Sequence, residues 1–129
     1  MPAAKPAEEP QAPARPPASL RPLSYIEQVR ATLAQHLPDG ESTLEQIAGR
    51  LSMNARTLRR RLNEEGKDYT QVLDELRREL ALAYMRNPYC NPNEVAELLG
   101  FSQPSTFTKA FRRWTGRTPA QYLSRRTRS

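Results

Sequence analysis

The stretch NARTLRRRLNEEG, residues 54–66, carries four arginines within six positions, with leucines set among them. Guanidinium groups form planar, bidentate hydrogen bonds with phosphate and similar acceptors, so this stretch suits anion binding. On a helix with about 100° per residue, Ala55, Leu58 and Leu62 fall on one side. The polar side chains fall opposite or on the flanks: Arg56, Thr57, Arg59, Arg60, Arg61 and Asn63. We therefore expect the leucines to dock the helix and the cations to face outward.

A second stretch, PSTFTKAFRRWT at residues 104–115, has the same two-sided character. Phe107, Ala110, Phe111 and Trp114 recur at helical spacing, which indicates a core-facing stripe. The other side mixes cations with hydroxyl groups: Ser105, Thr106, Thr108, Lys109, Arg112 and Arg113. Arg and Lys donate to guanine O6 and N7 or to phosphates, and Ser and Thr reach bases or backbone without crowding. Both outer faces therefore predict contact with a nucleic-acid duplex.

The two stretches belong to an internal repeat. Positions 47, 48, 51 and 53 match positions 95, 96, 99 and 101 in hydrophobic character, and Leu58 and Leu62 match Phe107 and Phe111. Each copy has the pattern of two helices joined by a tight turn, at 52–54 in the first copy and at 100–102 in the second. This is the layout of a helix-turn-helix unit, whose second helix enters the major groove of DNA.

Capping signals predict where the first three helices begin and end. Boxes of the form S-x-x-E predict the starts of the first two: Ser24 with Glu27, and Ser42 with Glu45. The first helix is expected to stop near Pro38 to Gly40. Asn54 is expected to cap the third helix, residues 55–64, with Gly66 just beyond its end.

A longer helix over about 69–86 is expected to link the two copies. Its inward stripe would be Val72, Leu73, Leu76, Leu80, Ala83 and Tyr84. At 1.5 Å per residue it would hold the two outer helices about 27 Å apart, close to the roughly 34 Å of one DNA turn. Its acidic residues are expected to pair with arginines of the same helix and neighbouring charges on a solvated surface: Asp74, Glu75 and Glu79 with Arg77 and Arg78.

In the second copy, Asn91 is expected to cap a short helix that begins at Pro92. Ser102 is expected to cap the next helix, with Pro104 tolerated in its first turn. The dipeptide Thr118–Pro119 predicts the start of a small C-terminal helix. No stretch alternates as a β-strand would, so the sequence predicts an all-α fold.

Composition narrows the class of partner. The chain has 129 residues, 20 Lys and Arg against 14 Asp and Glu, and a formal net charge of +6, which favours polyanions. No apolar run is long enough to span a bilayer and no secretory signal is evident, so we expect a soluble cytoplasmic protein with no membrane partner. One cysteine and one histidine cannot supply a usual zinc site, and no nucleophile, base and orienting group converge. We therefore expect no metal, no cofactor and no enzymatic activity.

The chain divides into a tail and one domain. Residues 1–22 contain seven prolines and little to bury, which predicts a disordered Pro/Ala-rich linker. Its charges sum to only +1, so nearly all of the basic excess lies in the domain expected over 23–129. Within that domain we expect the first helix-turn-helix at about 43–65, the linking helix at about 69–86 and the second helix-turn-helix at about 92–115.

The run EVAELLGFSQPSTFTKAFRRWTGRTPAQY, residues 94–122, closely resembles the signature of the AraC/XylS-type bacterial transcription regulators. The shared features are the Gly-Phe turn, the Phe-x-x-x-Phe spacing, the following Gly and the later Pro. The run LEQIAGRLSMNARTLRRRLNEEG, residues 44–66, resembles the first helix-turn-helix of the same family. The resemblance covers about residues 24–125 and is specific, because two motifs and their spacing agree.

This resemblance implies a seven-helix, bipartite DNA-binding domain with two helix-turn-helix subdomains joined by a long helix. It also implies sequence-specific binding of double-stranded DNA by an activator of transcription that recruits RNA polymerase, with a companion N-terminal effector or dimerisation domain. The family's base-reading positions fall on Arg56, Arg59 and Arg60 in the first recognition helix, and on Pro104, Ser105, Thr106 and Lys109 in the second. Pro104 departs from the pattern, because its side chain has no hydrogen-bond donor or acceptor.

Two other functions stay open on the residues alone. The basic faces also fit non-specific binding of nucleic acid, and the helical pattern also fits a protein-interaction module. RNA readers usually expose aromatic side chains to unstacked bases, which this pattern lacks. Competition between duplexes in a binding assay separates these possibilities.

Overall fold

The computed structural model describes residues 22–128, with side chains described up to Ser124. Over this part the chain forms seven α-helices and one short 3₁₀ helix and contains no β-strand, which confirms the all-α class. No helix of the described part is long and apolar enough to cross a lipid bilayer. The linker expected over residues 1–22 lies outside the described residues, apart from Pro22.

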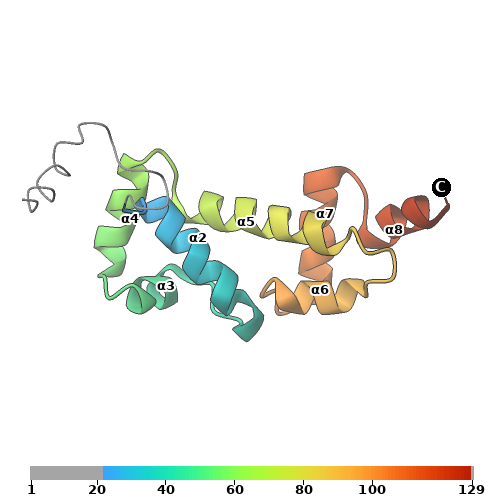
Figure 1. Ribbon diagram of the computed structural model, residues 1–129, viewed down its shortest axis with the longest axis horizontal. Helices are drawn as coiled ribbons and strands as arrows, with labels where there is room; N and C mark the ends of the chain where they lie inside the picture. Colours follow the sequence, from blue (N-terminus) through green and yellow to red (C-terminus); the bar gives the residue numbers. More distant parts are fainter. Residues whose placement is uncertain (1–21, 129) are drawn as a thin grey trace, which may run out of the picture.

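The helices follow one another in two groups separated by a long one. In chain order they are α2 (Tyr25–His36), the 3₁₀ helix η2 (Leu37–Asp39), α3 (Leu44–Arg50), α4 (Ala55–Glu64), α5 (Tyr69–Tyr84), α6 (Pro92–Leu98), α7 (Pro104–Thr115) and α8 (Pro119–Arg128). Figure 1 shows α5 running along the long axis, with α2, α3 and α4 gathered toward one end and α6, α7 and α8 toward the other. This arrangement is the expected pair of subdomains joined by a linking helix.

Each half has its own hydrophobic core. The first core joins α2, α3 and α4 to the start of α5, and its fully buried residues include Val29, Leu33, Ile47, Leu58 and Leu62. The second core joins the end of α5 to α6 and α7, and its buried residues include Ala81, Met85, Val95, Leu99, Phe107 and Phe111. Leu80 packs against both cores. Because both cores include residues of α5, this helix connects the two halves by apolar packing, the main source of stability.

Most helices begin where their capping residues predict. The expected box of Ser24 and Glu27 caps α2, with the Ser24 hydroxyl accepting from the Glu27 N–H at 3.0 Å. The Asn54 side chain accepts from the first N–H groups of α4, and Asn91 does the same for α6. These polar side chains replace the hydrogen bonds that the first turn of a helix cannot make internally.

Two caps lie one residue beyond the expected position. α3 is capped by Thr43 instead of Ser42, because Thr43 and Gln46 form a reciprocal capping box of their own. The N-cap position of α7 is Gln103 instead of the preceding serine, and the Gln103 side chain makes no capping hydrogen bond. The reason is that a residue before proline is held in extended backbone, which leaves Pro104 as the first helical residue.

The turns of the two repeats share one hydrogen-bond pattern. The Met53 N–H bonds to the Ala48 carbonyl at 2.8 Å, and the Phe101 N–H bonds to the Ala96 carbonyl at 3.0 Å. This six-residue closure requires a left-handed residue just before its donor. That residue differs between the turns: Ser52 with φ 56° and Gly100 with φ 82°.

The linking helix is shorter than expected, and its buried face changes along its length. It ends at Tyr84 and not near Arg86, so its 16 residues span about 24 Å at 1.5 Å per residue. Ala83, expected in the inward stripe, is exposed, whereas Ala81 and Met85 are fully buried. The expectation failed because the start of α5 packs on one core and its end on the other, so no single stripe serves both.

Candidate nucleic-acid interface

α4 is fixed to the first half by apolar packing and by a cap. Leu58 and Leu62 are fully buried, as their spacing predicts. Just beyond the helix, the Glu65 carboxylate accepts hydrogen bonds from the Tyr25 N–H at 3.0 Å and the Ile26 N–H at 2.9 Å. Both N–H groups belong to the first turn of α2, where a negative charge is favourable. Glu65 therefore holds the end of α4 against the start of α2.

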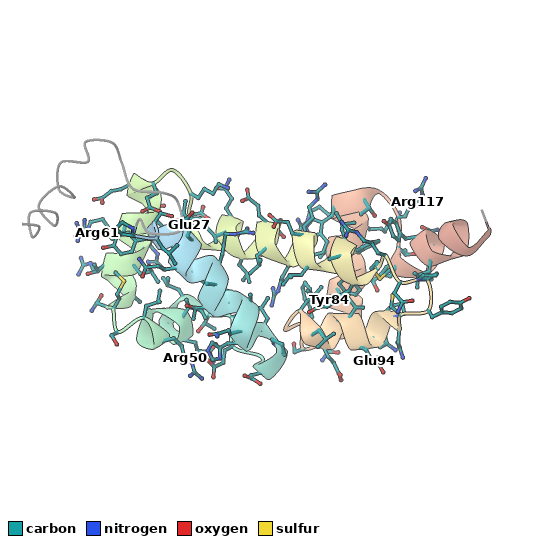
Figure 2. The ribbon with its side chains drawn as sticks, viewed as in Figure 1. Glu27, Arg50, Arg61, Tyr84, Glu94 and Arg117 are labelled. Atoms are coloured by element: carbon teal, nitrogen blue, oxygen red, sulfur yellow. The ribbon has the colours of Figure 1, made fainter. Side chains whose placement is uncertain are left out.

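Arg61 turns toward α2 and adds to this contact. Its guanidinium lies over the Tyr25 ring, 5.7 Å from the ring centroid, which is a cation–π geometry. Figure 2 shows Arg61 beside the first turn of α2, where Glu27 also lies. Arg61, expected on the flank of the outer face, therefore belongs to the contact between α2 and α4.

The outer face of α4 is a cationic strip open to solvent. A shallow depression along it is lined by Arg56, Thr57, Arg59, Arg60, Asn63 and Glu64. All of these are exposed except Thr57, which is half-buried. Within the described residues, the guanidinium groups of Arg56 and Arg59 have no partner, and Arg60 has only Glu64 at 3.7 Å. An exposed ion pair at that distance contributes little, so all three cations are available to an anionic ligand.

α7 is held in the second half by aromatic packing. Phe107 and Phe111 are buried, and Trp114 is half-buried on the same side. The Phe111 ring centroid lies 5.7 Å from that of Phe107, 6.4 Å from that of Trp114 and 5.2 Å from that of Tyr122. The last two contacts are edge to face, the arrangement that ring quadrupoles favour. The expected buried side of this helix is confirmed, with α8 contributing Tyr122.

The outer face of α7 is also open to solvent. Its exposed residues are Ser105, Thr106, Lys109 and Arg112. Within the described part of the chain, the Lys109 and Arg112 side chains have no ion-pair or hydrogen-bond partner. Thr108 is half-buried, and its hydroxyl donates to the Pro104 carbonyl at 3.1 Å. Its donor is thus already used inside the helix.

Arg113, also expected on this face, is held by the linking helix. Its Nη2 lies 3.0 Å from Asp74 Oδ1, and the Trp114 indole N–H donates to the same carboxylate at 3.2 Å. Asp74 lies on α5, so this carboxylate joins α5 to α7. Arg113 remains exposed, but its guanidinium already has an internal partner.

The other acidic residues of α5 also bind neighbouring elements and not arginines of their own helix. Arg30 of α2 lies 2.6 Å from Glu79. This hydrogen bond lowers the pKa of Glu79 and raises that of Arg30. Lys67, in the segment before α5, pairs with Glu75. The expected pairing with neighbouring charges is therefore found, but the partners come from other segments, and within the described residues no ion pair joins these carboxylates to Arg77 or Arg78.

Arg77 is the residue that sequence reasoning missed. Its Nε donates to the Leu99 carbonyl at 2.8 Å and its Nη2 to the Gly100 carbonyl at 3.2 Å. Both acceptors lie in the turn of the second repeat. No local pattern in the sequence marks this contact, because its partners are backbone atoms 22 and 23 residues further along the chain.

Both outer faces provide non-covalent recognition chemistry. They carry guanidinium, ammonium, amide and hydroxyl groups, which bind phosphates and base edges. Within the described residues, no three His, Cys, Asp or Glu side chains gather as metal ligands would.

The chain matches the family model of a helix-turn-helix domain over residues 47–125. It is 47% identical over 79 residues to the ornithine utilization regulator of Pseudomonas aeruginosa, a match that covers 61% of this chain and 23% of that protein. A second match, to a transcriptional regulator of the same organism, is 40% identical and covers 67% of this chain and 26% of that protein. The chain thus spans about a quarter of the length of these curated relatives.

Two similar solved structures cover most of this chain. A DNA-binding transcriptional dual regulator from Escherichia coli K-12 has a TM-score of 0.74 at 30% identity, covering 85% of this chain and 97% of that chain. The DNA-binding domain of AdpA, a global transcriptional factor in complex with a target DNA, has a TM-score of 0.68 at 30% identity, covering 82% of this chain and 96% of that chain.

Proposed function

The chain belongs to the helix-turn-helix family of AraC/XylS-type transcription regulators, and we propose that it binds double-stranded DNA sequence-specifically through α4 and α7. Each of these is the second helix of a repeat, and each turns a cationic face to solvent. The presence of two such faces on one chain is the observation that carries the proposal. In this mode each helix enters one of two successive major grooves.

The geometry of the linking helix supports this mode. α5 spans about 24 Å, and α4 and α7 pack at its opposite ends (Figure 1). Successive major grooves on one side of a duplex lie roughly 34 Å apart, a distance of the same order as the length of α5. The proposed base contacts are Arg56, Arg59 and Arg60 in the first groove, and Ser105, Thr106 and Lys109 in the second. Thr57, Asn63, Thr108, Arg112 and Arg113 are proposed to position the duplex.

The proposal extends to regulation. The named relatives are transcription regulators, and we infer that this chain acts as an activator at bacterial promoters in the cytoplasm, with RNA polymerase as a partner. A companion effector or dimerisation domain is the proposed source of control, since the chain spans about a quarter of the length of those relatives. A promoter fusion tests activation: expression of this chain should raise transcription from a promoter that carries its site.

Selection of bound duplexes from a random pool tests the DNA-binding proposal. We expect one enriched motif with two conserved halves about one helical turn apart. The double variant Arg59→Ala with Arg60→Ala should relax one half only, and Ser105→Ala with Lys109→Ala the other. Retention without an enriched motif would favour the alternative of non-specific nucleic-acid binding. No retention of any duplex would favour a protein-interaction module.

A further inference from the structure

The two halves of the molecule touch where the turn of the second repeat meets the end of α2. A Cβ atom at Gly100 would lie 3.0 Å from the Leu37 carbonyl oxygen and 3.2 Å from the Leu37 Cδ2. Leu37 begins η2 and is fully buried in the first core. Glycine fits this position because it adopts the left-handed backbone without strain and because a Cβ there would crowd Leu37 of the other half.

Arg77 of α5 closes the same junction from the other side. Besides its hydrogen bonds to the Leu99 and Gly100 carbonyls, its guanidinium lies 4.2 Å from the centroid of the Phe101 ring. A Cβ at Gly100 would also lie 3.3 Å from Arg77 Nη2. Burial lowers the pKa of Arg77 from its ordinary value. One side chain thus satisfies two carbonyls at the end of α6 and stacks on the first aromatic residue after it.

Within residues 22–124, the turn of the first repeat has no such junction. Ser52 occupies the position equivalent to Gly100 and is exposed to solvent. A residue with a side chain is accepted there, although its backbone is left-handed as well. The requirement for glycine in the second turn therefore comes from the neighbouring half and not from the repeat itself.

We propose that Arg77 and Gly100 set the placement of α7 relative to α4, and with it the spacing between DNA half-sites that the protein accepts. Arg77 is a positioning residue: it acts on DNA through the turn that carries α7. This inference rests on the proposed function, since it assumes a two-part site. When α4 and α7 are held rigidly, both can bind one duplex only if its half-sites have the matching spacing. On such a duplex the second contact is intramolecular, and the affinity of the chain rises.

The test measures affinity for the selected two-part duplex and for versions with the half-sites one or two base pairs closer or further apart. The wild-type chain should show a sharp optimum. Arg77→Met keeps the apolar stem but removes both donors and the cation. Linkage of two contacts raises affinity roughly 10²- to 10⁴-fold. At the optimal spacing, we expect Arg77→Met to lose at least about tenfold of this gain in affinity. Its affinity for a duplex with one half-site should be unchanged.

Two variants separate positioning from general loss of structure. Arg77→Lys should fall between wild type and Arg77→Met, because an ammonium cannot bridge two carbonyls and stack on a ring at once. Arg78→Met, at an exposed neighbouring position of the same helix, should keep the wild-type spacing profile. Gly100→Ser, which introduces the serine of the first turn, should flatten the profile as Arg77→Met does.

The outcomes are distinguishable from failure of the proposed function. If the wild-type chain selects no two-part duplex, the proposed function is wrong. If the wild-type chain selects a two-part duplex, but both Arg77→Met and Gly100→Ser keep the wild-type spacing optimum, the inference is overturned. This holds even if the affinity of the variants falls equally for every duplex. Such a uniform fall is the signature of a smaller folded fraction. Flattening in either variant with retained half-site affinity supports the junction.

Discussion

Ser52 holds a backbone conformation that costs free energy. Its φ of 56° lies in the left-handed region, where a side chain costs about 1–2 kcal/mol. We predict that Ser52→Gly raises the free energy of unfolding by about 0.5–1 kcal/mol, because relief of this strain exceeds the extra unfolded-state entropy of glycine. A urea titration should show a higher midpoint with an unchanged slope. Ser52→Ala keeps the strain and serves as control; an equal gain there would contradict this explanation.

Cations without internal partners should contribute most to DNA affinity. Arg59 on α4 and Lys109 on α7 are exposed and lack partners in the described part of the chain. We predict that Arg59→Ala or Lys109→Ala weakens binding to the selected duplex by about 1–3 kcal/mol, with helicity and unfolding midpoint unchanged. Fluorescence anisotropy measures the affinity, and circular dichroism measures the helicity and the unfolding midpoint. Arg78→Ala on α5 is the control, and wild-type affinity in both α4 and α7 variants would count against the proposed interface.

The outward direction of these cations was predictable from the sequence, whereas their partners were not. Helical spacing alone places Leu58 and Phe111 inside and Arg59 and Lys109 outside, since side-chain direction on a helix follows from position. Arg113 also falls outside, but its partner Asp74 lies 39 residues away in the chain. A helical projection contains no information about such neighbours, so the division between available and engaged cations required the structure.

At the scale of elements, the two cores make local loss of stability possible. Phe111 is fully buried and contacts three rings, so Phe111→Ala should lower the free energy of unfolding by about 3–5 kcal/mol. Because α2, α3 and α4 pack on a separate core, amide hydrogen exchange should accelerate more in α6 and α7 than in those helices. Leu62→Ala is the reciprocal variant and should accelerate exchange mainly in α3 and α4. Equal acceleration everywhere in both variants would show that the halves unfold as one.

The contact between α2 and α5 should weaken in acid. The Arg30 guanidinium lowers the pKa of Glu79 below its ordinary value of 4.5. A carboxyl group with a lowered folded-state pKa stabilises the fold above the unfolded value, and this contribution is lost as pH falls through the folded pKa. Glu79→Gln should therefore lower the free energy of unfolding by less than about 1 kcal/mol at pH 7, since the pair is largely exposed, and by progressively less as pH falls below 4.5. Urea titrations of the wild-type chain and of Glu79→Gln at pH 7 and pH 3 measure the difference between their free energies of unfolding. The same difference at both pH values would contradict this explanation.

Helix positions were largely predictable, and the errors have local physical causes. Asn54 and Asn91 were identified correctly because each immediately precedes its helix and no competing cap stands beside it. Ser42 and Thr43 each begin a capping-box pattern, so the pattern alone does not decide between them, and in the structure Thr43 and Gln46 form the reciprocal pair. Ala83 lies on the inward side only if a single apolar stripe runs the full length of α5. The helix instead packs on two cores, one at each end, and its buried side changes between them.

At the scale of the whole molecule, the duplication predicts two similar units but not their relative placement. Similar units follow from matching apolar positions, which any repeat shows. Their placement depends on the contacts of Arg77 and of Gly100 with Leu37, in which backbone atoms take part. Backbone acceptors leave no pattern in the sequence. In the sequence, the difference between Ser52 and Gly100 at equivalent positions is a sign of this placement. Its cause is visible only in the structure, where Gly100 lies against Leu37 of the first half.

Salt dependence tests both faces at once. Besides Arg113, which is paired with Asp74, the outer faces carry five exposed cations: Arg56, Arg59 and Arg60 on α4, and Lys109 and Arg112 on α7. If three to five of them neutralise phosphates, log K should fall against log salt with a slope of roughly −2.7 to −4.5, because each contact releases condensed counterions. Anisotropy titrations at several salt concentrations measure this slope.

Variants at the two faces show how the contacts divide between phosphates and bases. A cation that binds phosphate should, when replaced by alanine, reduce the slope by about one and weaken all duplexes alike. A cation that reads a base should instead relax the preference at one position of the motif. We expect Arg112→Ala to follow the first pattern and Arg59→Ala the second, since Arg59 is proposed to contact a base and Arg112 to position the duplex. A flat salt response of the wild-type chain would contradict phosphate contact by either face, because exposed cations cannot bind a polyanion without releasing its counterions.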